Sequence, residues 1–451
     1  MTYNQCLETL TSLGHELRGV KFDLQAIRAI LETLGHPERR YPTAIVGGTN
    51  GKGSTCAMLA SILQTAGYRT GLYTSPHLVR ANERIRVNGE EISDQDFARD
   101  FTAVWDCAER LLREKVLATR PSFFEFLTAT AFVHFERARI GFAVLEVGMG
   151  GRLDATNVTE PRVTVITNVA LDHQEFLGTT IPEIAYEKSG IITTGTPVIT
   201  ASEDPQAREV IRRRAEQVGV ARFQAIWNAD VSIHDPLDGR YEFDLALDGE
   251  FLGRFGSPLM GKFQVKNAVA AIAAARELRR QGWNINAEAI GEGLRKARWP
   301  GRLEVVSERP LAVLDGAHNT AAAREIAAFV RENWAGRRLI LVYATMRDKA
   351  FGEITEILFP HAQKVYLTRP QQARAAAPEE ILATAKDTRT EMVISPDPVQ
   401  AFEAALGECT PEDIVLAAGS LFLVGEIKRH ALLSSRTPEA PSVREAMTPL
   451  R

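Results

Sequence analysis

The sequence predicts an α/β protein with two domains, and three observations support this fold class. The chain has 451 residues, more than one hydrophobic core usually serves. Apolar runs typical of strands buried on both faces, such as GFAVLEVG (141–148) and RVTVITNV (162–169), alternate with helical stretches. A glycine-rich turn, GGTNGKGS (47–54), follows an apolar strand and opens a helix, as phosphate-binding loops do.

The elements of the first domain follow from apolar periodicity and from helix stop signals. A short apolar strand precedes the glycine-rich turn, and glycine ends two of the helical stretches. The expected segments are a strand over 43–46 and helices over 54–66, 123–139 and 180–189.

The pattern changes between residues 231 and 259. YEFDLALDGEFLGRF alternates polar and apolar residues around Asp248-Gly249, which predicts an antiparallel hairpin. We therefore expect a small antiparallel β appendage at about 225–262, followed by an alanine-rich helix over 267–280.

A second α/β unit is predicted beyond RWPGR (298–302), which breaks the preceding pattern. The spacing of its apolar strands, LAVLD, LILVYAT, KVYLT, MVIS and IVLAAGS, is typical of a Rossmann-like sheet. The predicted domains are 1–297 and 298–433. The tail, 434–451, has little apolar content and is expected to be flexible.

The composition disfavours several classes of partner. With 53 basic and 57 acidic side chains, the net charge of −4 gives no broad field for nucleic acid or for a membrane surface. No apolar run approaches the roughly 20 residues of a membrane-spanning helix, and MTYNQCLETL does not resemble a signal peptide. The four cysteines lie far apart, without metal-ligand spacing. We expect a cytoplasmic protein with reduced thiols.

Polar residues follow three strands of the first domain at the points where those strands end. The glycine-rich loop follows Val46, Glu146 closes one strand, and Asp172 and His173 follow another. If these strands share a parallel sheet, their carboxyl ends meet at one edge, where ligands bind. The backbone amides of 49–54 could then cradle phosphate, with Lys52 on the outer phosphates and Glu146 as an oxygen ligand for Mg²⁺. The set is suited to a metal-bound nucleotide.

Each of these signals also has an ordinary structural explanation. The strict pattern G-x-x-x-x-G-K-[ST] fails, because Gly53 occupies the hydroxyl position. A glycine-rich segment of this kind could be simply a turn without a binding role. His173 could be a structural histidine, and Lys188 a solvated charge near a helix end. Asp315 and His318 in DGAHN could merely shape a tight turn. Their joint placement at strand ends is what favours a nucleotide site.

Nine motifs in order along the chain resemble those of the folylpolyglutamate synthase/dihydrofolate synthase family, in the Mur ligase superfamily. They extend from about residue 44 to residue 426, and they are GGTNGKGS, GLYTSPHL, ERIRVNG, FFEFLTATAF, VLEVGMGGRLDATN, LDHQEFLGTTIPEIAYEKSGII, WPGRLE, LDGAHN and GSLFLVGE. The resemblance implies an N-terminal P-loop ATPase domain and a C-terminal Rossmann-like glutamate-ligase domain.

The activity that this resemblance implies is an ATP-dependent amide ligation. ATP would phosphorylate a carboxylate of a folate or of dihydropteroate, and the amino group of L-glutamate would displace phosphate from the acyl phosphate. The implied cofactors are ATP and two Mg²⁺ ions, with a monovalent cation such as K⁺ as a further candidate. The implied partners are these small molecules, with no nucleic acid or membrane, and the chain is expected to be a monomer.

Site roles carried over from the resemblance, position by position, fall into four groups. The nucleotide contacts are Thr49, Asn50, Gly51, Lys52, Gly53, Ser54, Asn267, Arg302, Asp315 and His318. The metal ligands are Ser75, Glu146 and His173, and the substrate contacts are Phe124, Asp154 and Ser420. The catalytic residues are Lys52, Lys188 and His318. Lys188 resembles a lysine that the family carbamylates, which would turn a cation into an anion able to hold the second Mg²⁺.

The chain departs from the family pattern at three positions. Phe263 stands where the family usually has His, which removes a polar contact to the nucleotide. Thr320 replaces a proline after DGAHN, and Phe422 replaces a common tyrosine. None of the three lies in the phosphate loop or among the expected metal ligands.

Two other functions compete with the folate ligase. A Mur-type ligase acting on a cell-wall precursor is disfavoured by TSPHL and FFE, which resemble the folate branch of the superfamily. It is also disfavoured because only about 43 residues precede the ATP loop, too few for an additional UDP-binding domain. A nucleotide-hydrolysing switch protein would not need a second α/β domain with polar strand ends of its own.

Overall fold

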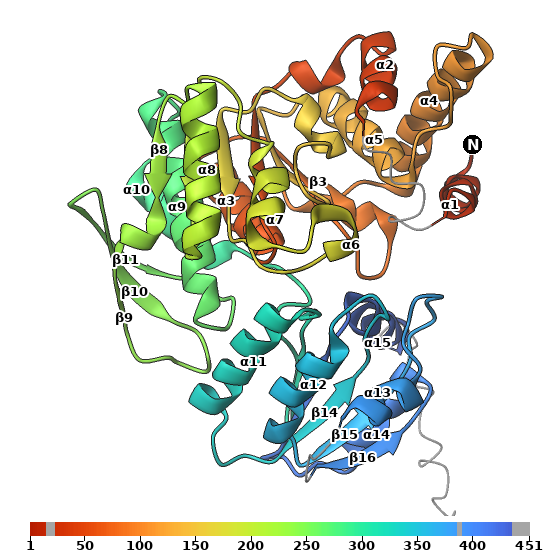
Figure 1. Cartoon of the computed structure of the whole chain (residues 1–451), viewed down its shortest axis with the longest axis vertical. Coiled ribbons are helices and arrows are strands. Elements are labelled where there is room, and N and C mark those ends of the chain that lie inside the picture. The colour runs from red at the N-terminus through yellow and green to blue at the C-terminus, as the bar shows by residue number, and fades with distance from the viewer. Residues whose placement is uncertain (15–22, 386–389, 435–451) are drawn as a thin grey trace, which may run out of the picture.

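The computed structural model describes residues 1–14, 23–385 and 390–434, and it shows two α/β units, each built on its own sheet (Figure 1). Among the described residues, the first sheet has eight strands in the order β4-β3-β2-β5-β1-β6-β7-β8. Six of them run parallel, while β3 and β4 pair antiparallel at one edge. Nearly all of the predicted flexible tail, from residue 435, lies outside the described residues.

The strands of the first sheet are short and mostly buried. Their bounds are β1 Thr43–Gly47, β2 Thr70–Tyr73, β3 Ile85–Val87, β4 Glu90–Glu91, β5 Phe142–Glu146, β6 Val163–Ile166, β7 Val198–Thr200 and β8 Phe223–Ala225. Side chains of a strand point alternately to its two faces, so Ala44 and Val46 pack on one side of β1 and Ile45 on the other. Apolar residues at every position are therefore needed to bury both faces.

Helices cover both faces of this sheet. One face carries α3 Lys52–Thr65, α9 Phe263–Arg280 and α10 Ala287–Lys296. The other face carries α4 Asp94–Arg113 and α5 Phe123–Arg137, with α1 Tyr3–Ser12 and α2 Gln25–Thr33 against them, and then α7 Ile181–Ser189 and α8 Pro205–Val218. The short helix α6 Gln174–Leu177 precedes α7.

The predicted appendage is a three-stranded antiparallel sheet in the order β11-β10-β9. Its strands are β9 Asp230–Ile233, β10 Glu242–Leu247 and β11 Glu250–Gly256, and the β10–β11 turn holds Asp248-Gly249, as the sequence predicts. Phe243, Leu245 and Leu247 join the core that α9 forms with the first sheet. The appendage is thus packed onto the N-terminal unit.

The C-terminal unit has six strands among the described residues, in the order β12-β13-β17-β14-β15-β16, all parallel except β12. They are β12 Glu304–Glu308, β13 Leu311–Leu314, β14 Leu339–Tyr343, β15 Lys364–Leu367, β16 Glu391–Ile394 and β17 Ile414–Ala418. The helices around them are α11 Thr320–Asn333, α12 Phe351–Leu358, α13 Pro378–Thr384, α14 Pro398–Gly407 and α15 Leu421–Ser434. This is the predicted Rossmann-like sheet.

Short 3₁₀ turns complete the described secondary structure: Pro37–Arg39, Ala81–Arg84, Ala155–Val158, Ile226–Asn228 and Phe359–His361. None of the described helices is long and apolar enough to cross a membrane. The domain limits 1–297 and 298–433 stay predictions, although the second sheet begins at Glu304, close to the predicted boundary.

Two helices begin earlier than the sequence pattern predicts. Helix α3 begins at Lys52, not at residue 54, and α9 begins at Phe263, not at residue 267. Neither start carries a side-chain cap: Gly51 precedes α3 and Lys262 precedes α9. Neither residue supplies the capping side chain that would mark a helix start in the sequence, so the pattern alone places both starts too late.

The close packing of α10 on α3 yields a stability prediction. A Cβ on Gly293 would lie 2.5 Å from the Cα of Ile62, so Gly293→Ala must push the two helices apart. Overpacking of this kind should lower the free energy of unfolding by about 1–3 kcal/mol, measured by urea denaturation. Gly291→Ala, in the same helix with only Arg295 Nη1 at 3.6 Å, should instead be neutral or stabilising by up to about 1 kcal/mol. Equal effects at both positions would contradict this packing argument.

Candidate functional site

One cavity of about 500 Å³ is lined by both units, and it contains every residue to which the sequence analysis gave a site role. The carboxyl ends of β1, β5 and β6 form one wall, because these strands are adjacent and parallel. The loops that follow β13 and β17 contribute the other wall through Asp315, His318 and Ser420. The structure therefore brings together residues from 23 to 422 of the chain.

The phosphate loop connects β1 to α3. Its turn requires glycine, because Gly48 and Gly51 have φ of 138° and 83°, and a Cβ on either would overlap a neighbouring side chain. Asn168, after β6, fixes the loop: its Oδ1 accepts from Asn50 N at 2.7 Å, and its carbonyl accepts from Thr49 N at 2.9 Å. Because no side chain caps α3, the first amides of the helix are available to an anion.

Two lysines reach the carbonyls of this loop. Lys52 Nζ donates to Gly48 O and Thr49 O, both at 3.1 Å, and Lys188 Nζ donates to Gly48 O at 2.9 Å. Lys188 is only 4% exposed, and burial, reinforced by the charge of Lys52, lowers its pKa to about 7. Near neutral pH a large fraction of this amine is uncharged, so the solvated-charge reading of Lys188 does not hold.

The three predicted metal ligands come from the carboxyl-end side of the first sheet: Ser75 follows β2, Glu146 ends β5, and His173 lies in the segment after β6. Glu146 is buried, and burial raises its pKa to about 6, although the charge of Lys52 and the Ser75 N–H, 3.1 Å from Oε2, oppose the shift. His173 precedes α6 with φ of 51°, and burial lowers its pKa to about 3, so the imidazole is neutral at pH 7.

This donor set fits Mg²⁺ bound together with phosphate. Among the described residues, no group of three or more His, Cys, Asp or Glu side chains is arranged to hold a metal. Mg²⁺ does not need such a group, because it keeps several waters and takes phosphate oxygens as ligands. Glu146, a buried carboxylate with a raised pKa, lines the same cavity as Ser75 and the neutral imidazole of His173, and these three side chains would supply the few protein ligands that remain.

The DGAHN loop after β13 is fixed by its own hydrogen bonds. Asp315 accepts from Leu303 N at 2.8 Å and from Ala317 N at 2.7 Å, so this carboxylate shapes the turn even as it lines the cavity. His318 Nδ1 lies 2.8 Å from Gly316 O, and burial lowers the pKa of His318 to about 4. The carbonyl can only accept, so Nδ1 carries the proton and Nε2 is free to accept a hydrogen bond.

The predicted substrate residues occupy three places in the cavity wall. Phe124 packs under Gly148, where a Cβ would lie 2.5 Å from the ring. Both carboxylate oxygens of Asp154 already accept hydrogen bonds from the loop, including Gly148 N at 2.9 Å. Ser420 Oγ accepts from Phe422 N at 3.1 Å. Direct contacts of Asp154 and Ser420 with substrate stay predictions.

The first turn of α9 packs against the phosphate loop and closes that side of the cavity. Asn267 donates through Nδ2 to Gln264 Oε1 at 2.8 Å, and it packs so closely on the phosphate loop that only glycine fits at Gly51. Phe263, which replaces the usual His, also lines the cavity. This side of the cavity is therefore bounded by an aromatic ring in place of an imidazole.

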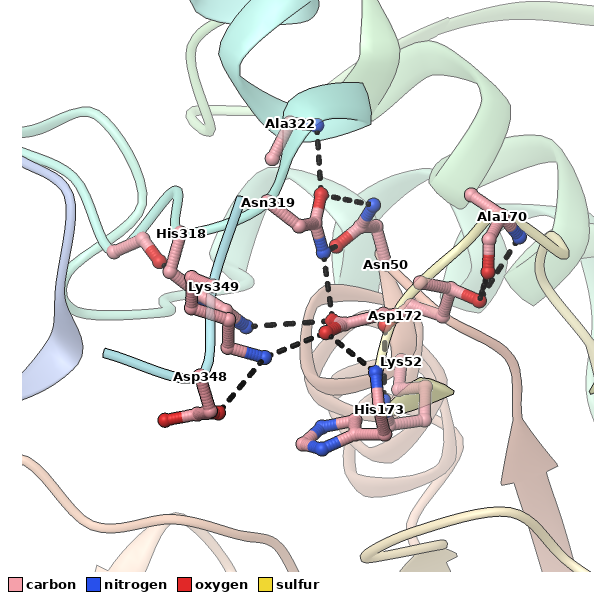
Figure 2. A network of polar contacts seen from close by, with 12 residues as sticks. Asn50, Lys52, Ala170, Asp172, His173, His318, Asn319, Ala322, Asp348 and Lys349 are labelled. Atoms are coloured by element: carbon pink, nitrogen blue, oxygen red, sulfur yellow. Dashed lines mark hydrogen bonds and ion pairs between the residues drawn. The ribbon is translucent and has the colours of Figure 1, made fainter. Parts of the chain in front are cut away.

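Sequence reasoning missed several residues of the site. Asn319 and Lys349 contact Asp172 from the C-terminal unit, and no pattern in the sequence connects positions so far apart (Figure 2). Their placement after β13 and β14 was the available signal. Glu125 and Gln264 also line the cavity, and within the described residues Glu125 Oε1 and Gln264 Nε2 have no hydrogen-bond partner.

The fold and the cavity define a class of protein, the ATP-dependent amide ligases of the Mur type. The family model described as the Mur ligase middle domain matches residues 46–275, and the Mur ligase glutamate ligase domain matches residues 301–421. Within this class, the chain belongs to the dihydrofolate synthase/folylpolyglutamate synthase family.

Relatives that carry these names align over most of the chain. A dihydrofolate synthase/folylpolyglutamate synthase of Bacillus subtilis is 37% identical over 91% of this chain and 95% of its own length. The Escherichia coli protein of the same name is 33% identical over 90% and 91%. A Haloferax volcanii relative, a probable bifunctional folylpolyglutamate synthase/dihydropteroate synthase, is longer, and this chain covers 48% of it.

Solved structures share the whole architecture. Mycobacterium tuberculosis folylpolyglutamate synthase complexed with ADP superposes with a TM-score of 0.86 at 29% identity, over 97% of this chain and 99% of that one. Escherichia coli FolC in complex with DHPP and ADP gives a TM-score of 0.82 at 29% identity, over 96% and 98%. The sequence resemblance to this family is thereby confirmed.

Lys52 provides the first test of the nucleotide site. Lys52→Ala removes a point charge from the phosphate loop and should lower turnover by about 10²–10³-fold, measured as phosphate release. The free energy of unfolding should change by no more than about 1 kcal/mol, because the side chain is only partly buried. Lys296→Ala, at an exposed ion pair on α10, is the control and should leave turnover unchanged. Wild-type turnover in Lys52→Ala would show that Lys52 has no role in the reaction.

The lowered pKa of Lys188 predicts how stability depends on pH. Between about pH 7 and 10.5 the unfolded chain binds a proton at Lys188 that the folded chain does not, so stability falls as pH is lowered through this window and levels off below it. Lys188→Met should therefore raise the free energy of unfolding at pH 7, by on the order of a few kcal/mol. The gain should fade towards pH 10.5, measured by urea denaturation in CO₂-free buffer. A gain that does not vary with pH would contradict this assignment.

Proposed function

We propose that this chain joins L-glutamate to the carboxylate of a folate or of dihydropteroate, at the expense of ATP. The observation that supports the proposal is the single cavity in which a phosphate loop and a carboxylate from one unit face polar loops from the other. Relatives with the matching name, and a related structure holding ADP and DHPP, support the choice of substrates. Cytoplasmic location, a monomeric state and a role for K⁺ stay predictions.

The chemistry requires activation of the acceptor, because a carboxylate is a poor electrophile. Its oxygen would attack the γ-phosphorus of ATP, releasing ADP and forming an acyl phosphate. The loop amides and Lys52 would stabilise the negative charge on the phosphoryl group and hold it in line. The amine of glutamate would then attack the acyl carbon, and phosphate would leave with the C–O bond electrons.

His318 is placed to serve the second half of this reaction. Its Nδ1 proton is committed to Gly316 O, and the ring is neutral at pH 7, so Nε2 can accept a hydrogen bond. We assign it the task of orienting the attacking amine, which must lose a proton as the amide forms. Arg302, which also lines the cavity, would supply positive charge to the phosphates from the C-terminal unit.

Ser75, Glu146 and His173 would hold Mg²⁺, which supplies charge neutralisation on the triphosphate when bound. Lys188 is a candidate for the second metal site, because a neutral amine can add CO₂ and become a carbamate anion. Its pKa of about 7 and its position on the phosphate loop support this role.

A substrate matrix tests the proposal. Dihydropteroate and tetrahydrofolate are each incubated with ATP and Mg²⁺, with and without L-glutamate, and products are identified by mass. Phosphate release that requires both substrates, with a product heavier by one glutamyl residue, is the expected result. Release indifferent to both substrates would indicate a nucleotide switch, and activity only with a cell-wall precursor would indicate a Mur-type ligase.

Carbamylation of Lys188 has its own test. Lys188→Ala should be inactive and should regain part of its activity with added acetate or another short carboxylate, which can occupy the vacated position. Lys52→Ala is the matched control, because a carboxylate cannot replace a cation and should not restore it. Full activity of Lys188→Ala without any additive would exclude the role.

A further inference from the structure

A buried carboxylate on the N-terminal unit is held by side chains of the C-terminal unit. Asp172 Oδ1 accepts from Lys349 Nζ at 2.5 Å, and Oδ2 accepts from Asn319 Nδ2 at 2.9 Å (Figure 2). His318 Nε2 lies 3.7 Å from the same Oδ2. The side chains of Asp172 and Lys349 are only 7% and 9% exposed, so this ion pair is shielded from water.

Among its described residues, the N-terminal unit offers Asp172 no comparable partner. Within the described residues, its remaining hydrogen bond comes from the backbone N–H of His173 at 2.9 Å, and the cation that forms an ion pair with it, Lys349, comes from the C-terminal unit. Separating the two units would therefore leave a carboxylate without its cation, which is strongly unfavourable wherever water cannot replace the partner.

The same group of contacts reaches the phosphate loop. Asn319 caps α11 through Oδ1, which accepts from Ala322 N at 2.9 Å and so fixes the orientation of the side-chain amide. Asn319 Nδ2 also donates to Asn50 Oδ1 at 3.0 Å, and Asn50 belongs to the loop (Figure 2). One asparagine thus connects the C-terminal unit to both Asp172 and the nucleotide-binding segment.

We propose that Asp172 is a positioning residue that clamps the C-terminal unit onto the nucleotide site. By binding Lys349 and Asn319, it sets the distance between the phosphate loop and the DGAHN loop, and so the placement of His318 and Arg302 against the reactants. Asp172 acts through these groups and not on the substrate. The inference rests on the proposed function only for the identity of the reaction that the clamp serves.

Asp172→Asn is the direct test, because it keeps the shape and removes the charge. Whichever way the new amide turns, its nitrogen faces a donor, either Lys349 Nζ or Asn319 Nδ2. With saturating substrates, kcat should fall by about 10–100-fold, since small displacements of reacting groups cost this much. The Kd for ATP, set mainly by the loop, should change by less than about threefold.

Closure is measured separately by small-angle X-ray scattering of the full chain with ATP and Mg²⁺. The wild type should be compact, and Asp172→Asn and Lys349→Met should both show a larger radius of gyration. The double variant Asp172→Asn/Lys349→Met should have a radius of gyration no larger than that of Lys349→Met, because it no longer carries a buried carboxylate without a partner. Arg429→Ala, which removes an exposed contact to Val79 O on the other unit, is the control and should behave like wild type.

Scattering and ATP binding do not depend on the acceptor substrate, so these measurements test the clamp independently of the result of the substrate matrix. Wild-type scattering and kcat in Asp172→Asn would overturn the proposal. Effects of the two substitutions on kcat and on the radius of gyration that simply add in the double variant would also overturn it, because they would show that the two side chains act independently. A uniform loss of ATP binding with normal compactness would assign Asp172 to the nucleotide site and refute the clamp.

Discussion

The site depends on the order of three parallel strands, β5-β1-β6, in the first sheet. Parallel register places Glu146 beside Val46, at the point where the chain enters the phosphate loop. On the other side, β6 leads into Asn168, which holds that loop, and then into Asp172 and His173. Because parallel strands all end at the same edge, a phosphate loop, a carboxylate and an imidazole converge without any of them being close in sequence.

Burial then sets the charge states of the ionisable side chains at this edge. It lowers the pKa of Lys188 to about 7 and raises that of Glu146 to about 6, so each group lies near its charge transition at neutral pH. Opposite shifts in one water-poor cavity are typical of sites in which a ligand completes the charge balance. A triphosphate with its metal would bring the compensating charges that the protein side chains do not supply to one another.

The C-terminal unit contributes through the ends of its own parallel strands. Loops after β13, β14 and β17 carry His318, Lys349 and Ser420 to the cavity. Hydrogen bonds inside the loops, such as those of Asp315, fix their shape before any ligand binds. Contacts across the units, centred on Asp172, decide where those loops stand relative to the nucleotide.

Residues marked by local pattern could be recognised from the sequence. The phosphate loop, Glu146 and His173 stand at strand ends, and the Asp248-Gly249 turn marks the appendage. The sequence pattern places the starts of α3 and α9 too late, because glycine and lysine precede them and neither offers the capping side chain that signals a helix start. Only the family resemblance points to Phe124, Asp154 and Ser420, since nothing in their immediate sequence distinguishes them.

By itself, the sequence determined the α/β class, the phosphate loop and the family, because these depend on periodicity and on motifs within short segments. Only the tertiary structure decided which buried charges face each other. Lys349 and Asn319 meet Asp172 across 177 and 147 residues of chain, and the pairing depends on how two separate sheets stand against each other. Packing likewise decided the ionisation of Lys188, because the surrounding residues exclude the water that would otherwise stabilise its charged form.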